Sequence, residues 1–159
     1  MKHTMYILVE NYAGVLSKIT GLFSRRGFNI ESLAVGVTTD MSVSRITIVA
    51  DGDEYVAEQI QKQLNKLIPV IEVRLLKNHI SRELALIKVN SNVKSRVEIM
   101  GIAELMKAKI IDVGVNTITV EIADTVDNVD TIVELFRPYG IKEIARTGTV
   151  AIERSAGSK

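Results

Sequence analysis

Residues 11–16 (NYAGVL) have the side chains and the backbone needed to hold a free amino acid. They join an alternating apolar segment, predicted to be a strand, to a segment with helical periodicity. Amide protons in the first turn of a helix lack partners inside the helix and carry the positive end of its dipole, so they bind carboxylates. Gly14 has no Cβ to keep a ligand from the backbone, and the Asn11 carbonyl can accept from an ammonium group.

The same residue types also have an ordinary structural explanation, in which Gly14 serves a tight turn and Asn11 caps locally. A second polar point is Asn29, which follows the expected helix stop at Gly27. It either caps the end of that helix, since asparagine tolerates the left-handed conformation, or reaches a ligand held at the helix start of a neighbouring chain. Local spacing alone favours the structural explanation at both points.

Few residues in the sequence could support redox, metal-dependent or catalytic chemistry. Cysteine is absent, which excludes disulfides, thiolate metal sites and cysteine nucleophiles. His3 and His79 have no acidic residue at a metal-site spacing. The acidic cluster at 51–54 could bind a hard cation, but a capped loop explains it without one. The acidic residues at 124–130 flank an expected helix start, where they favour the helix dipole. Glycine-rich phosphate loops, nucleophile elbows and zinc-protease motifs are missing. We therefore expect no catalytic residue and no metal site.

The composition is that of a globular protein. The chain has 159 residues, of which 47% are hydrophobic and 25% charged, with a net charge of +1. This charge balance does not indicate a basic surface that would bind nucleic acid or an anionic membrane. No segment reaches the ~18 apolar residues of a membrane helix, and the N-terminus lacks the features of a signal peptide. We expect a cytoplasmic protein with no nucleic-acid or membrane partner.

The periodicity of apolar residues predicts the same order of elements twice. In the first half we expect strand 5–10, helix 15–26, strands 30–37 and 45–50, helix 56–67 and strand 71–75. In the second half we expect strand 84–89, helix 94–107, strands 110–115 and 118–123, helix 129–136 and a last strand 144–152. The repeat lies in element order and not in residue identity, so it is a weak repeat signal.

This order indicates an α+β protein of two tandem ferredoxin-like βαββαβ domains. Each is expected to form an antiparallel four-stranded sheet with two helices on one face. We place the domains at 1–77 and 78–159, joined by a short connector without Gly or Pro. Units of this size are marginal alone, and each leaves one sheet face bare. We therefore expect a homo-oligomer, and a two-fold dimer in particular.

A long motif in the first half resembles a known family. Residues 11–33 read N-x-x-G-x-L-x-K-I-x-G-L-F-S-x-R-G-F-N-I-E-S-L, which is similar to the opening of the small regulatory subunits of acetolactate synthase, also called acetohydroxyacid synthase. Segments 44–48, 59–67, 81–89, 111–113 and 144–148 also resemble that family, although the second half is more loosely patterned. The resemblance covers nearly the whole chain.

The resemblance implies an N-terminal amino-acid-binding ACT domain and a C-terminal ferredoxin-like domain. It also implies a homodimer that binds a feedback inhibitor, usually valine, between paired ACT domains. The ligand positions of the family fall on these residues: Asn11, Gly14, Val15, Leu16, Asn29 and Ile30. Some members have alanine where this chain has Val15, and a side chain that narrows the pocket there would alter ligand preference.

The resemblance further implies a partner, the large catalytic subunit. That subunit binds thiamine diphosphate, Mg²⁺ and FAD, and it condenses two pyruvates, or pyruvate with 2-oxobutyrate, in branched-chain amino acid biosynthesis. The small subunit raises activity and confers inhibition without catalysing, so we expect no cofactor in this chain. The alternative is a free-standing ACT-type amino-acid sensor that regulates another partner.

Overall fold

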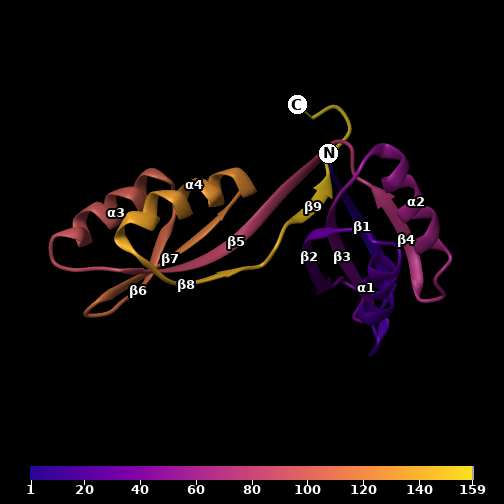
Figure 1. Cartoon of the computed structure of the whole chain (residues 1–159), viewed down its shortest axis with the longest axis horizontal. Helices are drawn as coiled ribbons and strands as arrows, with labels where there is room; N and C mark the ends of the chain where they lie inside the picture. Colours follow the sequence, from indigo (N-terminus) through magenta and orange to yellow (C-terminus); the bar gives the residue numbers. More distant parts are fainter. Residues whose placement is uncertain (159) are drawn as a thin grey trace. The chain divides into compact units, whose positions relative to one another are not determined.

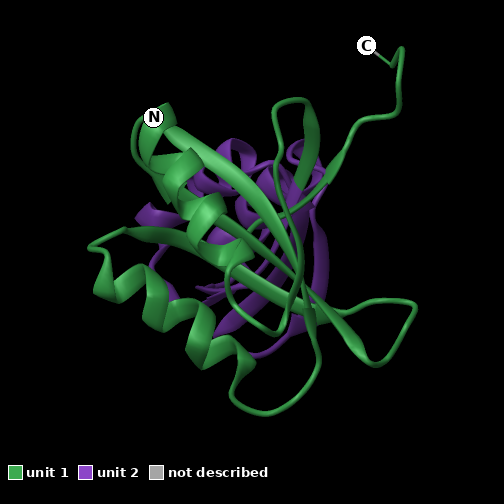
Figure 2. Cartoon of the chain, turned by 90° about the vertical axis from the view of Figure 1, so that its right-hand side faces the viewer, with its two compact units in different colours: residues 1–81, 149–159 green, residues 82–148 purple. Residues whose placement is uncertain are grey.

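A computed structural model describes residues 1–158. Contacts divide it into two compact units, which are described separately (Figure 2). The first unit holds residues 1–81 together with the C-terminal segment from Thr149 onward, and the second holds residues 82–148. In the described part of the chain, no helix has the length and apolarity that a membrane crossing requires.

The first unit is an antiparallel four-stranded sheet with two helices on one face (Figure 1). Its elements are β1 (Lys2–Glu10), α1 (Val15–Arg25), β2 (Ile30–Val37), β3 (Val43–Asp51), α2 (Glu54–Asn65) and β4 (Val70–Leu75). The strand order is β2-β3-β1-β4, so β2 and β4 are the edges. Alternate residues of β1 and β3, such as Ile7 and Ile48, are fully buried against Ile19 of α1 and Leu64 of α2.

The second unit repeats the arrangement. Its elements are β5 (His79–Asn90), which begins in the first unit, α3 (Ser95–Leu105), β6 (Lys109–Val113), β7 (Thr117–Asp124), α4 (Val126–Phe136), a short 3₁₀ turn η1 (Arg137–Tyr139) and β8 (Ile141–Arg146). The strand order is β6-β7-β5-β8, with both helices on one face (Figure 1). The predicted α+β fold of two tandem ferredoxin-like domains is confirmed.

Two backbone hydrogen bonds recur at the same place in each unit. In the first unit, the amide of Glu10 donates to Pro69 O (2.9 Å) and that of Asn11 to Ser42 O (2.8 Å). In the second unit, the corresponding bonds run from Asn90 to Gly140 O and from Ser91 to Asn116 O, both 2.8 Å. Each unit therefore fixes the end of its first strand against the same two neighbouring turns.

The structure differs from the sequence expectation at the C-terminal end. The single strand expected over 144–152 is wrong, because the chain forms β8 and then a separate strand β9 (Val150–Glu153), which pairs with β5. Gly148, with φ +83°, breaks the run, since the left-handed conformation cannot continue a strand. Residues from 149 onward group with the first unit, whereas the expected division placed them in the second.

Candidate functional site

The start of α1 is a cluster of backbone donors without acceptors. Gly14 precedes the helix at φ +90°, and no side chain caps this end. Four amides in this turn form no hydrogen bond within residues 1–158: those of Ala13, Gly14, Leu16 and Ser17. No acidic residue lies in the first turn to neutralise the helix dipole. These donors suit an anionic group supplied from outside the turn.

Each of the other three α-helices bonds one first-turn amide to a side chain of its own segment. The Asp53 carboxylate accepts from the amide of Val56 at the start of α2 (2.8 Å), and the Thr125 hydroxyl accepts from Asn128 at the start of α4 (3.3 Å). At the start of α3 the Asn92 side chain accepts from the amide of Ser95 (2.8 Å). The start of α3 occupies the same place in the second unit as the start of α1 does in the first, yet it is self-capped.

Gly14 leaves this turn open. A Cβ built on Gly14 would meet no atom within 4 Å, and the positive φ is costly for most other residues. The side chain of Val15 is buried in the core, and its amide donates to Tyr12 O (3.4 Å). Leu16 is 42% exposed on the first helical turn and presents an apolar side chain beside the free amides.

Asn11 does not cap α1, which corrects one structural explanation of this residue. Its side-chain amide donates to Met41 O (2.9 Å), in the turn between β2 and β3. The amide group is therefore used, while the side-chain oxygen makes no hydrogen bond in the described chain. Asn11, two residues before the free amide of Ala13, thus keeps one acceptor, as binding of an ammonium group would require.

Asn29 is not the cap of α1 either. The left-handed residue after the helix is Gly27, with φ +70°. The Asn29 carbonyl accepts from the amide of Asp51 (3.4 Å) at the end of β3, while its side chain is exposed and makes no hydrogen bond within residues 1–158. Ile30 packs partly against the core. Of the two interpretations of Asn29, the helix cap is wrong.

One chain does not bring the predicted site residues together. Asn11 is bonded to Ser42, before β3, whereas Asn29 is bonded to Asp51, at the end of that strand. Nine residues of extended strand separate these points by about 30 Å. A site that uses both Asn11 and Asn29 therefore needs a second copy of the chain.

Sequence reasoning missed a polar network on the helix-free face of the first sheet. The Arg45 guanidinium lies 3.9 Å from the centre of the Tyr6 ring. The Tyr6 hydroxyl donates to Glu72 (3.1 Å), which also accepts from Arg74 (2.8 Å). Burial, followed by the bond to Glu72, raises the pKa of Tyr6. In the sequence these residues occupy outward-facing positions on strands that become neighbours, and that pattern could have indicated the network.

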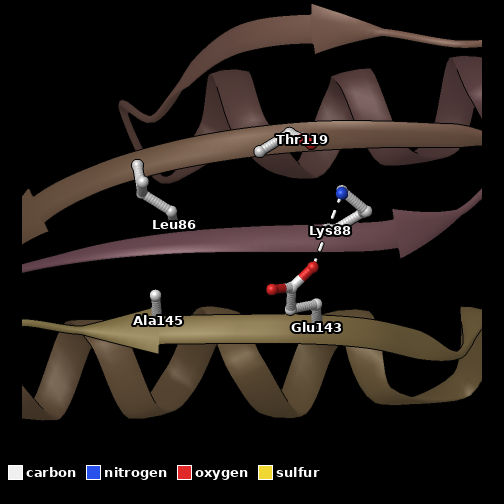
Figure 3. A pocket seen from close by; sticks show the side chains of 5 residues that line it. All are labelled: Leu86, Lys88, Thr119, Glu143 and Ala145. Atoms are coloured by element: carbon white, nitrogen blue, oxygen red, sulfur yellow. Dashed lines mark hydrogen bonds and ion pairs between the residues drawn. The ribbon is translucent and has the colours of Figure 1, made fainter.

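A hollow of about 200 Å³ lies on the helix-free face of the second sheet (Figure 3). It is lined by Leu86, Lys88, Thr119, Glu143 and Ala145. The Lys88 ammonium and the Glu143 carboxylate, 3.5 Å apart, bound one end. No predicted site residue lines this hollow. Among the described residues no group of three or more His, Asp or Glu side chains is arranged to hold a metal ion.

Comparison with known proteins identifies the family to which both halves of the chain belong. Residues 5–72 match the model of the acetohydroxyacid synthase small subunit-like ACT domain, and residues 82–155 match that of the small subunit of acetolactate synthase. The chain belongs to the acetolactate synthase small-subunit family. This membership supports a regulatory, non-catalytic role for the chain, and it implies a large catalytic subunit as partner.

Similar proteins match along nearly their whole length. An acetolactate synthase small subunit from Bacillus subtilis is 47% identical, and the match covers 100% of this chain and 94% of that protein. A probable small subunit from Archaeoglobus fulgidus is 48% identical over 97% of this chain and 98% of its own length. The crystal structure of the Thermotoga maritima small subunit superposes with a TM-score of 0.93 at 38% identity, covering 98% of both chains.

Proposed function

We propose that this chain activates the catalytic subunit of acetolactate synthase and makes it sensitive to feedback inhibition by valine. The observation that carries the proposal is the uncapped start of α1, whose four free amides can bind the carboxylate of an amino acid. The free oxygen of Asn11 would accept from the ammonium group. Leu16 supplies an apolar surface for a small aliphatic side chain.

A two-fold dimer paired through β2 would complete this site. β2 is an edge strand of the first sheet, and Val35 and Val37 on it are 47% and 53% exposed. Antiparallel pairing of two β2 strands would place Asn29 and Ile30 of one copy near the end of β2 in the other. That end leads into the turn to which Asn11 is bonded. The valine would then contact α1 of one copy and Asn29 of the other.

A ligand shared by two copies acts by population shift. Its contacts exist only in the dimer geometry that brings both halves of the site together, so binding stabilises that geometry. Coupling of this kind is typically worth about 1–3 kcal/mol. Selectivity rests mainly on pocket size, where one methylene is worth about 1–3 kcal/mol, so leucine and isoleucine are expected as secondary ligands.

Reconstitution tests the proposal. The purified catalytic subunit, loaded with thiamine diphosphate, Mg²⁺ and FAD, is assayed for acetolactate formation with and without this chain, and the mixture is then titrated with valine. We expect higher activity on addition of the chain and loss of the added activity with valine. Unchanged activity, or activity that valine does not affect, would contradict the proposal.

The alternative is a free-standing amino-acid sensor that acts on another partner. A pull-down from cell extract distinguishes the two. Recovery of the thiamine-diphosphate enzyme supports the regulatory subunit, whereas valine binding without recovery of that enzyme supports the sensor.

A further inference from the structure

The C-terminal strand β9 lies on the helix-free face of the first unit (Figure 1). Besides the pairing of β9 with β5, three hydrogen bonds hold this segment: Thr149 N to Ser32 Oγ (2.8 Å), Arg45 Nη2 to Ala151 O (2.8 Å) and Arg154 N to Asn78 O (3.0 Å). Thr149 and Ala151 are only 5% and 6% exposed. The segment is therefore an integral part of the unit that carries the candidate ligand site.

The bond to Ser32 depends on an irregularity in β2. Ile30 pairs with Ala50 on β3, but Ser32 pairs with Val49, so Glu31 is an extra residue. Without this bulge, Ser32 would face the core, because side chains alternate along a strand. With it, Ile30 and Leu33 both pack against the core while Ser32 faces the opposite side, where Thr149 lies.

The bulge separates the proposed ligand contacts from the anchor of β9 by one residue. Asn29 and Ile30 precede Glu31, and Ser32 follows it. The Glu31 carboxylate is held by the Lys2 ammonium (2.9 Å). Because the strand continues through Glu31 without a loop, a change in the backbone at Ile30 must be absorbed at the bulge or passed to Ser32.

The link from this segment to the second unit is also short. The Thr147 amide donates to Leu84 O in the second unit (3.0 Å), and the Thr149 amide is bonded to Ser32 in the first. Gly148, with φ +83°, is the one residue between these two bonded positions. A displacement of Thr149 therefore reaches Thr147, the residue that follows β8, through a single residue.

We propose that the bulge at Glu31 couples the ligand segment Asn29–Ile30 to strand β9, with Ser32 as the positioning residue that transmits the change. This coupling rests on the proposed function, because it takes valine as the ligand at Asn29 and Ile30. Binding shifts the backbone at the bulge, Ser32 moves the amide of Thr149, and β9 and Gly148 pass the shift to the end of β8. Ser32 touches no ligand in this scheme.

The test follows backbone amide resonances of the full-length protein with Ser32→Ala, Ser32→Thr and the control Ser24→Ala. Ser24 is exposed on α1, and its hydroxyl makes no hydrogen bond in the described chain. Without valine, Ser32→Ala should speed hydrogen exchange at Thr149 about fivefold, the factor that one ordinary hydrogen bond contributes. Ser32→Thr keeps the hydroxyl and should restore protection, and Ser24→Ala should change nothing.

Valine is then added, with heat of binding recorded on the same samples. We expect the resonances of residues 149–153 to shift in the wild type and in Ser32→Thr. In Ser32→Ala we expect valine to bind with unchanged affinity and those shifts to disappear. If valine binds the wild type without moving residues 149–153, or moves them equally in Ser32→Ala, the coupling is wrong and the proposed function stands. If valine does not bind the wild type, the proposed function is wrong and the coupling is overturned with it.

Discussion

Asn11 and Asn29 are bonded to opposite ends of the same strand. The amide of Asn11 donates to Ser42 O just before β3, and the carbonyl of Asn29 accepts from Asp51, where β3 ends. Both side chains keep hydrogen-bonding capacity that the described chain does not use. The proposed ligand site therefore consists of two half-sites on each chain, which a two-fold dimer would join.

Gly14→Asp should abolish inhibition by valine. The new carboxylate would stand among the free amides of α1, occupy them and repel the carboxylate of the ligand. Gly14→Asn is the matched control, because asparagine tolerates positive φ and has the same size without the charge. We expect the asparagine variant to retain more inhibition in reconstituted holoenzyme titrated with valine. Unchanged inhibition in Gly14→Asp would reject this site.

Asn29→Ala should weaken valine binding with little effect on folding. The side chain is exposed and has no hydrogen bond within residues 1–158, so its loss should change the free energy of unfolding by less than about 0.5 kcal/mol. Calorimetric titration gives the affinity, and urea denaturation gives the stability. Wild-type affinity in this variant would remove Asn29 from the site.

The turn that supports Asn11 should be insensitive to pH in the neutral range. The Ser42 hydroxyl, and then the Ser42 amide, donate to the Asp40 carboxylate (2.6 and 2.9 Å) and lower the pKa of Asp40. A lowered pKa stabilises the folded turn above the unfolded value of about 3.9, and this contribution is lost as the pH falls through the lower folded pKa.

The side-chain amide resonances of Asn11 report on this turn, because that amide is bonded to Met41 O. They should stay constant from about pH 8 to 5 and shift only below about pH 4. A midpoint near neutral pH would show that another group controls the turn.

Glu83→Ala should destabilise the protein by about 1–3 kcal/mol. Glu83 is 5% exposed and forms an ion pair with Arg146, which also pairs with Asp130 (2.9 Å). Removing the carboxylate leaves a partly buried guanidinium with one partner fewer. Chemical denaturation measures the loss. The control is Glu134→Ala, whose partner Arg137 is well exposed, and it should have little effect. Equal losses in both variants would contradict this account of Glu83.

The sequence predicted elements whose apolar residues recur with one clear period. Val15, Ile19 and Leu22 marked α1, and Arg25 lies in its last turn, as expected. Pattern alone failed at 144–152, because it joined the apolar residues on either side of 146–149 into one strand and did not show the left-handed break at Gly148. It also failed at the start of β5, where the polar residues from His79 onward suggested a connector.

The candidate site was only partly accessible to sequence reasoning. Spacing identified Gly14 and Asn11 before a helix, because the first turn of a helix always has free amides. It did not show that α1 lacks the cap that α3 has, since Asn92 and Ser95 bond through geometry that residue types alone leave open. The bulge at Glu31 was also hidden, because it inverts the facing of Ser32 without any glycine or proline to mark it.

The sharing of one site between two copies is tested most directly with a mixed dimer. A Gly14→Asp chain and an Asn29→Ala chain are coexpressed with different tags, and the heterodimer is isolated by two affinity steps. If each site joins Gly14 of one copy to Asn29 of the other, the heterodimer has one undamaged site, and calorimetry should show one valine per dimer at wild-type affinity. If no site of wild-type affinity returns, each site lies within one chain or elsewhere, and the shared-site account is contradicted.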